Sequence, residues 1–331
     1  MKILLGSHYF FPSSGGIETV SNLLAREFLK QGHEVRVVTQ TPGNGDFPFP
    51  VIREPGPFEL IRQVRWCDVF LQNNISLRTL WPLLFIRRPL FVTHQTWITN
   101  PDGSTGWQHW LKRRVLRHAT SFAISGAIAE SLPVPSILIG NPYDENVFRD
   151  SPAPPRAREL IFVGRLVSDK GAGLLLDAVK LVNPKPQLTI VGDGPERPAL
   201  EKQVIDLQLQ PQVEFAGSRH GEQLADLLRR HEILVVPSLW QEPFGIVALE
   251  GIACGCVVIG SAGGGLSEAI GPCGITFPNG NALALADAIQ RLLGDSAERD
   301  RLRQNAPAHL ARFKPRQVAA LYLETMAKAR R

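Results

Sequence analysis

The sequence predicts an α/β protein with two doubly wound domains, each built on a parallel sheet. Short β-rich apolar runs alternate with segments of helical periodicity, and this alternation occurs twice along the 331 residues. A chain of this length fits two domains, each able to bury its own core. A proline-dense stretch, Ser151–Arg158, separates the halves and is typical of a linker. We therefore expect domains over residues 1–150 and 151–310, with residues 311–331 forming a further C-terminal helix.

In the first half, five apolar runs have the composition of buried strands: Lys2–Leu5, Glu34–Thr39, Val69–Gln72, Leu90–Thr93 and Ser121–Ser125. Between the first two, Gly16–Gln31 carries apolar residues at helical spacing. A strand–helix–strand order of this kind predicts parallel strands with helices on both faces of the sheet.

The second half repeats the pattern, and its expected strands are Glu159–Val163, Gln187–Val191, Val213–Ala216, Ile233–Val236 and Val257–Gly260. The expected helices are Gly171–Leu181, Pro195–Leu207, Glu222–Arg230, Ile246–Ala253 and Ala282–Leu293, and a last helix, Pro315–Lys328, lies outside the alternation. Open parallel sheets bind ligands beyond the carboxyl ends of their strands. If the two edges face each other, the ligand lies in a cleft between the domains.

Composition excludes several classes of protein. Hydrophobic residues make up 44% and charged residues 20% of the chain, which excludes a disordered chain, a coiled coil and a collagen-like repeat. No window approaches the roughly 18 consecutive apolar residues of a membrane-spanning helix. Gly6, Ser7 and His8 interrupt the apolar start before it resembles a signal peptide. We therefore expect a cytoplasmic protein.

The charge and the cysteine content indicate which kinds of ligand to expect. Four cysteines without C-x-x-C spacing predict buried thiols in a reducing compartment, and no metal site. The net charge of +5 is mild and fits an anionic ligand or anionic lipid headgroups. By itself it does not indicate nucleic acid, which we do not expect as a partner.

Two loops that follow a strand and precede a helix could hold an anion. The first, Pro12–Gly16, ends in Gly15 and Gly16, and the alternative is a tight turn that needs glycine. The second runs from Gly164 and carries Arg165 and Lys170, which are spaced to reach one phosphate cluster. The alternative is that both are solvated surface cations.

The most informative stretch is Pro237–Ala269, where Glu242 precedes an expected helix and Glu250 lies within it. Carboxylates at the two ends of a ligand could accept hydrogen bonds from hydroxyls, while helix-start N–H groups hold phosphate between them. Such a ligand is a nucleotide sugar. The alternative assigns Glu242 to the helix dipole and Glu250 to the surface, although Glu250 interrupts an apolar helix. Gly264 and Gly265 follow after the next expected strand, and their lack of side chains would let a ligand approach the backbone closely.

Several common chemistries are missing from the sequence. There is no P-loop, no complete G-x-G-x-x-G, no G-x-S-x-G elbow and no H-E-x-x-H. No Asp-x-Asp pair is present to hold a divalent cation on a diphosphate. We therefore expect no metal and no cofactor, with Arg165, Lys170 and helix dipoles neutralising a departing diphosphate.

These residues together resemble glycosyltransferase family 4, whose members are retaining transferases of the GT-B fold with two Rossmann-like domains. The resemblance spans nearly the whole chain. It rests on Gly15-Gly16-Ile17-Glu18, Val163-Gly164-Arg165-Leu166 with Lys170-Gly171, Val191-Gly192-Asp193-Gly194-Pro195, and Glu242 and Glu250 at the spacing of an E-x7-E signature.

The resemblance implies a role for each of these residues. Arg165 and Lys170, with Gly164 beside them, would bind the donor diphosphate. Glu242 would contact the donor sugar, Glu250 would hold the ribose, and the backbone N–H groups of Phe244 and Gly245 would donate to the donor. His94 matches a histidine near the reacting carbon, and Gly16 would face the donor phosphate or the acceptor. The last helix resembles a segment that crosses back to the first domain.

Two segments mix aromatic and basic residues, Leu80–Arg88 and Trp107–His118. Basic amphipathic segments with tryptophan suit an anionic bilayer interface. The hypothesis is peripheral binding at the inner face of the membrane, where a lipid-linked acceptor would be met. The alternative is aromatic core packing with a solvated basic edge.

The sequence as a whole predicts a metal-independent, retaining hexosyltransferase. The donor would be a UDP- or GDP-sugar, and the acceptor a hydroxyl of a glycan or lipid-linked saccharide, as in polysaccharide biosynthesis. The alternatives are another GT-B enzyme, such as a sugar-nucleotide epimerase or a phosphorylase, and a non-catalytic protein that binds nucleotide sugars or lipids. No segment is marked for the pyridoxal-phosphate lysine that a phosphorylase needs.

Overall fold

The computed structural model of the chain describes residues 1–13, 15–98, 106–150, 156 and 158–329. The chain divides into two compact units, of which unit 1 comprises Met1–Pro142 with Phe313–Arg331 and unit 2 comprises Tyr143–Arg312. The predicted linker Ser151–Arg158 lies outside the described residues except for Arg156 and Arg158.

Unit 1 is built on a seven-stranded sheet in the order β3-β2-β1-β4-β5-β6-β7, with every pairing parallel. Its strands are β1 (Lys2–Ser7), β2 (Glu34–Thr39), β3 (Val51–Arg53), β4 (Val69–Asn73), β5 (Leu90–His94), β6 (Thr120–Ala123) and β7 (Ser136–Leu138). Its helices are α1 (Gly16–Lys30), α2 (Pro57–Trp66), α3 (Leu77–Leu80), η1 (Trp81–Leu84), α4 (Trp107–Leu116), α5 (Gly126–Ser131) and α14 (Pro315–Lys328).

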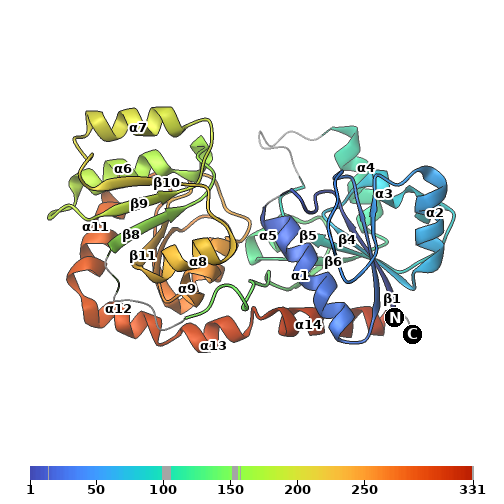
Figure 1. The fold of residues 1–331 in the computed structure, drawn as a ribbon. Coiled ribbons are helices and arrows are strands. Elements are labelled where there is room, and N and C mark those ends of the chain that lie inside the picture. Colours follow the sequence, from blue (N-terminus) through green and yellow to red (C-terminus); the bar gives the residue numbers. More distant parts are fainter. Residues whose placement is uncertain (14, 99–105, 151–155, 157, 330–331) are drawn as a thin grey trace. The chain divides into compact units, whose positions relative to one another are not determined.

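Helices cover both faces of this sheet, as the strand–helix alternation predicts (Figure 1). Side chains alternate along a strand, so neighbours in β5 serve different faces. Leu90 and Val92 join a buried cluster with residues of α2 and α4. Phe91 instead stacks on Phe122 of β6, whose ring meets Tyr322 of α14.

Tyr322 anchors the last helix within unit 1. Its side chain is 1% exposed, and its ring lies edge-on to Phe122 with 4.6 Å between centroids and to Phe28 of α1 with 6.4 Å. The hydroxyl of Thr93 donates a hydrogen bond to its Oη over 3.3 Å. The segment from Phe313 onward therefore belongs to the unit that begins at Met1, although residues 143–312 separate them in sequence.

Unit 2 is built on a six-stranded sheet in the order β10-β9-β8-β11-β12-β13, again with parallel pairings. Its strands are β8 (Arg158–Val163), β9 (Leu188–Val191), β10 (Val213–Gly217), β11 (His231–Val236), β12 (Val257–Ser261) and β13 (Gly274–Phe277). Its helices are η2 (Ser168–Lys170), α6 (Ala172–Leu181), α7 (Arg197–Asp206), α8 (Gly221–Arg229), α9 (Ile246–Ala253), α10 (Leu266–Ile270), η3 (Gly271–Cys273), α11 (Ala282–Gly294), α12 (Ser296–Arg303) and α13 (Ala306–Ala311).

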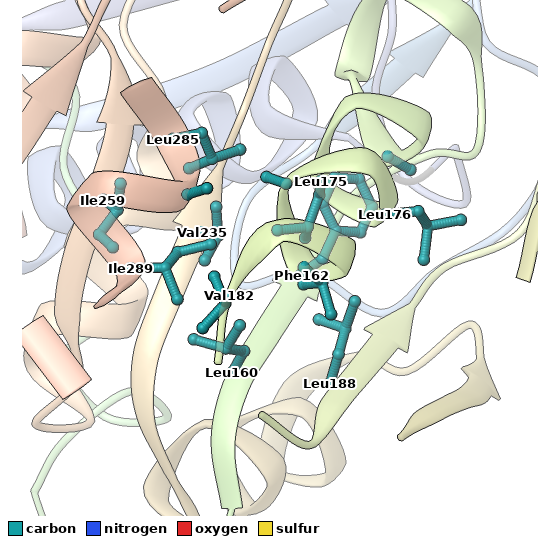
Figure 2. Close-up of a cluster of buried hydrophobic side chains, with 14 of the residues drawn as sticks. Leu160, Phe162, Leu175, Leu176, Val182, Leu188, Val235, Ile259, Leu285 and Ile289 are labelled. Atoms are coloured by element: carbon teal, nitrogen blue, oxygen red, sulfur yellow. The ribbon is translucent and has the colours of Figure 1, made fainter. Parts of the chain in front are cut away.

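One face of the unit 2 sheet packs on α6 and α11 (Figure 2). Leu160 and Phe162 of β8 point into this cluster. On the same face of the sheet, the cluster also contains Leu175 of α6 and Ile289 of α11. Ile161, which lies between them in sequence, is also fully buried, so β8 is covered on both faces. This explains why the strand reads as a continuous apolar run rather than as an alternation.

The sequence prediction missed the short outer strands β3, β7 and β13. Two of them have only three residues, and β7 leaves Ile137 and Leu138 exposed at the sheet edge. The predicted strand Ser121–Ser125 ends early at Ala123, because Ser125 instead caps α5 by accepting a hydrogen bond from the N–H of Ile128.

Two further predictions concern burial and membrane spans. All four cysteines are buried free thiols, as predicted, and burial raises the pKa of Cys67, Cys254 and Cys256 to about 12 and that of Cys273 to about 11. Within the described residues, none of the helices combines the length and the apolar character that crossing a bilayer requires.

Removing the Tyr322 ring should destabilise unit 1. We expect Tyr322→Ala to lower the free energy of unfolding by about 3–5 kcal/mol, because it empties a fully buried aromatic site between α1, α14 and β6. Five of the six tryptophans lie between Trp66 and Trp110, so tryptophan fluorescence during urea unfolding reports mainly on unit 1. The neighbouring Leu321→Ala is the control, since Leu321 is 46% exposed. Equal shifts for the two variants would contradict this anchoring role.

Candidate active site

In unit 2 the strand order reverses beside β8, which has β9 on one side and β11 on the other. The chain leaves the carboxyl end of β8 into residues 164–171 and the carboxyl end of β11 into residues 237–245. Open parallel sheets leave a crevice at such a switch point, where diverging connections cannot fill the space. The residues that the sequence singled out in this half lie on these two loops and on α9.

A charged cluster joins the two loops. Lys170 Nζ donates to Glu242 Oε1 over 2.6 Å, and the hydroxyl of Ser238 donates to the same oxygen over 2.7 Å. The side chains of Lys170 and Glu242 are only 24% and 11% exposed. The sequence predicted separate ligand-binding roles for Lys170 and Glu242, and the structure shows them in direct contact. Both donors contact Oε1, and neither contacts the second carboxylate oxygen of Glu242.

The loop that carries Lys170 is held against the end of β11. Gly171 has φ +71°, and a Cβ there would lie 2.0 Å from the carbonyl oxygen of Pro237. The N–H of Leu239 donates to the carbonyl of Asp169 over 2.9 Å. No larger residue fits at Gly171 without separating the loops, so this glycine allows Lys170 to reach Glu242.

The backbone of Glu242 is fixed by the loop after β12. Glu242 forms an isolated parallel bridge with Gly264, and the N–H of Gly265 donates to the Glu242 carbonyl over 2.7 Å. Gly264 has φ +77°, and a Cβ would lie 2.2 Å from that carbonyl oxygen. The sequence assigned these glycines to close approach of a ligand. In the structure they approach the protein's own loop and so aim the Glu242 side chain.

Ser238 and Asn279 complete this support and were not singled out as site residues from the sequence. The carbonyl of Ser238 accepts from the hydroxyl of Ser261 over 2.7 Å and from the side-chain amide of Asn279 over 3.1 Å. Asn279 Oδ1 accepts from the N–H of Gly263 over 2.8 Å. Ser238 stands four residues before Glu242, and this spacing was the signal in the sequence. Asn279 gives no local signal, because only folding brings it near.

Glu250 projects from α9 into a different environment. The structure describes no side chain or N–H group that donates to its partly buried carboxylate. Burial, with a smaller contribution from the nearby Asp144, raises the pKa of Glu250 to about 7. A neutral hydroxyl donor would satisfy such a carboxylate, because it adds hydrogen bonds without adding negative charge.

The residues that open α9 are partly enclosed. Gly245 is the N-cap of α9 with φ +93°, and the side chain of Phe244 is 2% exposed. The backbone N–H groups of Phe244 and Gly245, which the sequence predicts as donors, therefore lie at the N-terminus of α9. The positive end of the helix dipole there favours anions.

Arg165 is exposed at the carboxyl end of β8, and its side chain has no hydrogen bond or ion pair with the residues that the structure describes. Gly164 has its N–H engaged in the sheet, donating to the Val191 carbonyl over 3.0 Å. A ligand at this loop would therefore meet a cation at Arg165, rather than a free N–H at Gly164.

In unit 1 the glycine loop lies against a carboxylate of the chain itself. Gly15 is the N-cap of α1, and a Cβ there would lie 2.7 Å from Glu18 Oε2. Glu18 is 7% exposed and accepts from the hydroxyl of Ser13 over 2.9 Å. Gly16 begins the helix. The positive end of α1 thus already has an anion in its first turn.

His94 ends β5 and is 1% exposed. Its Nε2 lies 3.3 Å from Ser121 Oγ, and burial lowers its pKa to about 4. The ring is therefore neutral at physiological pH, so it can form hydrogen bonds but does not act as a cation. The next residue, Gln95, is hydrogen-bonded to Asn74 and Asn141, which position the chain directly after β5.

Similarity to known proteins agrees with this architecture. The chain is 34% identical over 181 residues to the D-inositol 3-phosphate glycosyltransferase of Corynebacterium urealyticum, covering 51% of this chain and 42% of that protein. It is 27% identical over 333 residues to the phosphatidylinositol N-acetylglucosaminyltransferase gpi3 subunit of Schizosaccharomyces pombe, covering 87% and 72%. The chain spans about two fifths of the length of the first of these relatives.

Among solved structures, Anabaena Alr3699/HepE in complex with UDP and glucose superposes with a TM-score of 0.80 at 22% identity, covering 99% of this chain and 100% of that one. At this identity the likeness establishes the fold, which is the GT-B fold of glycosyltransferases. Residues 144–309 match the family described as glycosyl transferases group 1. The chain belongs to this family, and the matched segment contains the complete cluster of Lys170, Ser238 and Glu242 together with Glu250.

The raised pKa of Glu250 makes stability depend on pH. Between about pH 4.5 and 7 the folded chain binds a proton at Glu250 that the unfolded chain has lost, so the free energy of unfolding falls as pH rises through this window. The contribution is at most about 3 kcal/mol. Urea unfolding from pH 5 to pH 8 should show a smaller decline in Glu250→Gln than in the native protein. Glu201→Gln, which alters an exposed carboxylate, should leave the decline unchanged. An unaltered profile in Glu250→Gln would contradict the burial of this group.

Proposed function

We propose that this chain is a retaining glycosyltransferase that moves a sugar from a UDP- or GDP-linked donor to a hydroxyl of a glycan or lipid-linked saccharide. The observation that supports this most is the cluster of Lys170, Ser238 and Glu242 at the switch point of unit 2. It combines a cation for phosphate with a carboxylate that can accept sugar hydroxyls, and both are held by buried loops. Membership of the group 1 family supports the same reaction class.

The donor would bind along the carboxyl edge of the unit 2 sheet. In this proposal Arg165 and Lys170 neutralise the diphosphate, and the N-terminus of α9 near Phe244 and Gly245 adds its dipole. Glu250 accepts hydrogen bonds from the ribose, and Glu242 accepts from the sugar. Because Lys170 already pairs with Glu242, the donor's diphosphate would share a cation that also orients the carboxylate for the sugar.

Transfer would proceed on one face of the sugar. The bond from the anomeric carbon to the diphosphate breaks as the acceptor oxygen bonds to that carbon, and the leaving phosphate takes the acceptor proton. The developing charge on the diphosphate is stabilised by Arg165 and Lys170, without a metal ion or cofactor in this proposal. His94, buried and neutral, would donate a hydrogen bond to a sugar hydroxyl rather than act as a base.

The acceptor belongs to unit 1 in this proposal. Glu18 beside Gly15 and Gly16 would repel a phosphate and attract a hydroxyl, which favours the acceptor over the donor phosphate as the neighbour of Gly16. Two relatives act, by their names, on inositol phosphate and on phosphatidylinositol, and both names fit an acceptor with several hydroxyls. A lipid-linked acceptor would place the protein at the inner membrane surface.

Two other functions make different predictions about the site. A sugar-nucleotide epimerase would bind the same donor but invert one carbon centre of its sugar, without an acceptor and with the sugar still attached to the nucleotide in the product. A non-catalytic binding protein would bind the donor and leave it intact. The largely buried contact of Lys170 with Glu242 favours a preorganised catalytic site over a non-catalytic binding protein.

Nucleotide binding tests the ligand class directly. We expect UDP or GDP, in EDTA, to raise the melting temperature of the protein, while ADP, NAD and pyridoxal phosphate do not. A ligand at a hundredfold its Kd adds about 2.7 kcal/mol of stability. Differential scanning fluorimetry with each ligand measures the shift. A shift that disappears in EDTA would overturn metal independence, and a shift with NAD or pyridoxal phosphate alone would overturn the donor assignment.

The charge of Lys170 should matter far more for turnover than for folding. We expect Lys170→Ala to lower kcat with the identified donor by about 10²–10³-fold, the cost of one lost preorganised donor to a transition-state anion. Lys170→Gln keeps a hydrogen-bond donor for Glu242 and should show the same loss. Lys202→Ala, which removes an exposed lysine of the same unit, is the matched control. Turnover of Lys170→Gln within threefold of the native rate would refute the proposed role.

A further inference from the structure

Five large apolar side chains protrude from unit 1, on α2, on α4 and at the end of η1. They are Phe58, Leu84, Phe85, Trp107 and Trp110, and each is between 63% and 88% exposed. Exposed apolar residues are normal when they are scattered singly, whereas several on one face indicate a binding surface.

These elements lie on the same face of the unit 1 sheet. Leu60 and Val64 of α2, Leu80 before η1 and Leu116 of α4 all belong to one buried cluster with Phe70 and Val92 of the sheet. Figure 1 shows α2, α3 and α4 on one side of these strands. Since their inner sides share a core, their outer sides form one surface, which we call the α2–α4 face. The opposite face is closed by α1 and α14.

The segments that build the α2–α4 face are strongly basic. In residues 57–98 and 106–118, nine lysines and arginines stand against two acidic residues, Glu59 and Asp68. This excess is larger than the net charge of +5 of the entire chain. Arg114 lies over the ring of Trp110 at 5.4 Å, so cation and aromatic ring occupy the same site on α4.

A basic hollow lies at the amino ends of β1, β4 and β5, beside the C-terminal end of α2. Its lining includes Lys2, Arg65, Arg87 and Arg88, with Asp68. The guanidinium of Arg88 is fixed by the carbonyls of Cys67 and Arg65, at 2.6 and 2.8 Å. Arg65 and Arg87 are exposed. An anionic headgroup at this hollow would therefore meet these cations, and Arg87 follows Leu84 and Phe85 in the same short segment of the chain.

We propose that the α2–α4 face binds the surface of an anionic lipid bilayer. The aromatic and aliphatic side chains enter the boundary between headgroups and acyl chains, and the arginines contact the anionic headgroups. A second copy of the chain is disfavoured, because a two-fold interface would bring the same cations together. Nucleic acid would satisfy the arginines but leave Leu84 and Phe85 in water. The binding itself does not depend on sugar transfer, although it would serve a lipid-linked acceptor.

Vesicle sedimentation of the full chain tests this proposal. We expect binding to vesicles of phosphatidylcholine with 30% phosphatidylglycerol, roughly the share of anionic lipid in an acidic membrane surface, and little binding to pure phosphatidylcholine. Binding should weaken at least tenfold when salt rises from about 0.05 to about 0.5 M, since headgroup contacts are screened. Binding that is equal for both lipids, or absent for both, would overturn the proposal.

Paired variants separate the two components of the surface. Phe85→Ser with Trp110→Ser removes apolar contacts from the segment after η1 and from α4. Arg87→Gln with Arg113→Gln removes two cations from the same two segments. Each pair should lower the partition coefficient at least tenfold. Ile205→Ser with Leu283→Ser, exposed apolar residues of unit 2, should leave it unchanged. Loss in the control, or retention in both test pairs, would assign the binding elsewhere.

Fold and donor site remain checkable in every variant. Far-ultraviolet circular dichroism and the UDP or GDP thermal shift should be native, because the substitutions lie on the outer side of unit 1. A nucleotide shift without vesicle binding would overturn the membrane proposal and leave sugar transfer standing. Vesicle binding without a nucleotide shift would do the reverse.

Discussion

The contact between the loops that follow β11 and β12 fixes the position of Glu242, and the site of unit 2 depends on it. The bridge between Glu242 and Gly264 leaves no room for a side chain at Gly264, since a Cβ would meet the Glu242 carbonyl at 2.2 Å. Gly171 permits a similar approach on the side of Lys170. The two charges therefore meet because three loops at one sheet edge are packed backbone against backbone.

The two glutamates of this region have different surroundings although they stand eight positions apart. Glu242 receives a cation and a hydroxyl, whereas Glu250 receives neither from the described residues and has a pKa of about 7. A buried ion pair is weak evidence for stability, because desolvation offsets the Coulomb attraction. The contact of Lys170 with Glu242 is better understood as preorganisation. It holds a cation and an acceptor in place before a ligand arrives.

The two faces of the unit 1 sheet are covered in different ways. Tyr322 closes one face by joining α14 to α1 and β6, so that a segment from the end of the chain completes the first core. The other face has a complete inner core but an outer surface rich in aromatic and basic side chains. Burial explains the first arrangement. The second exposes apolar area that folding alone does not require.

The sequence by itself determined the two α/β units, the inner strands, most of the helices of unit 2 and the family. Repeated apolar runs and strand-to-helix loops are local signals, and Arg165, Lys170, Glu242 and Glu250 could be singled out from them. Tertiary structure decided what these residues touch. The contacts of Lys170 with Glu242, of Asn279 with Ser238 and of His94 with Ser121 join positions 27 to 72 residues apart, and local periodicity carries no information on such contacts. Tertiary structure also decided the three short edge strands. They form because each pairs with a neighbouring strand, and their own composition does not predict it.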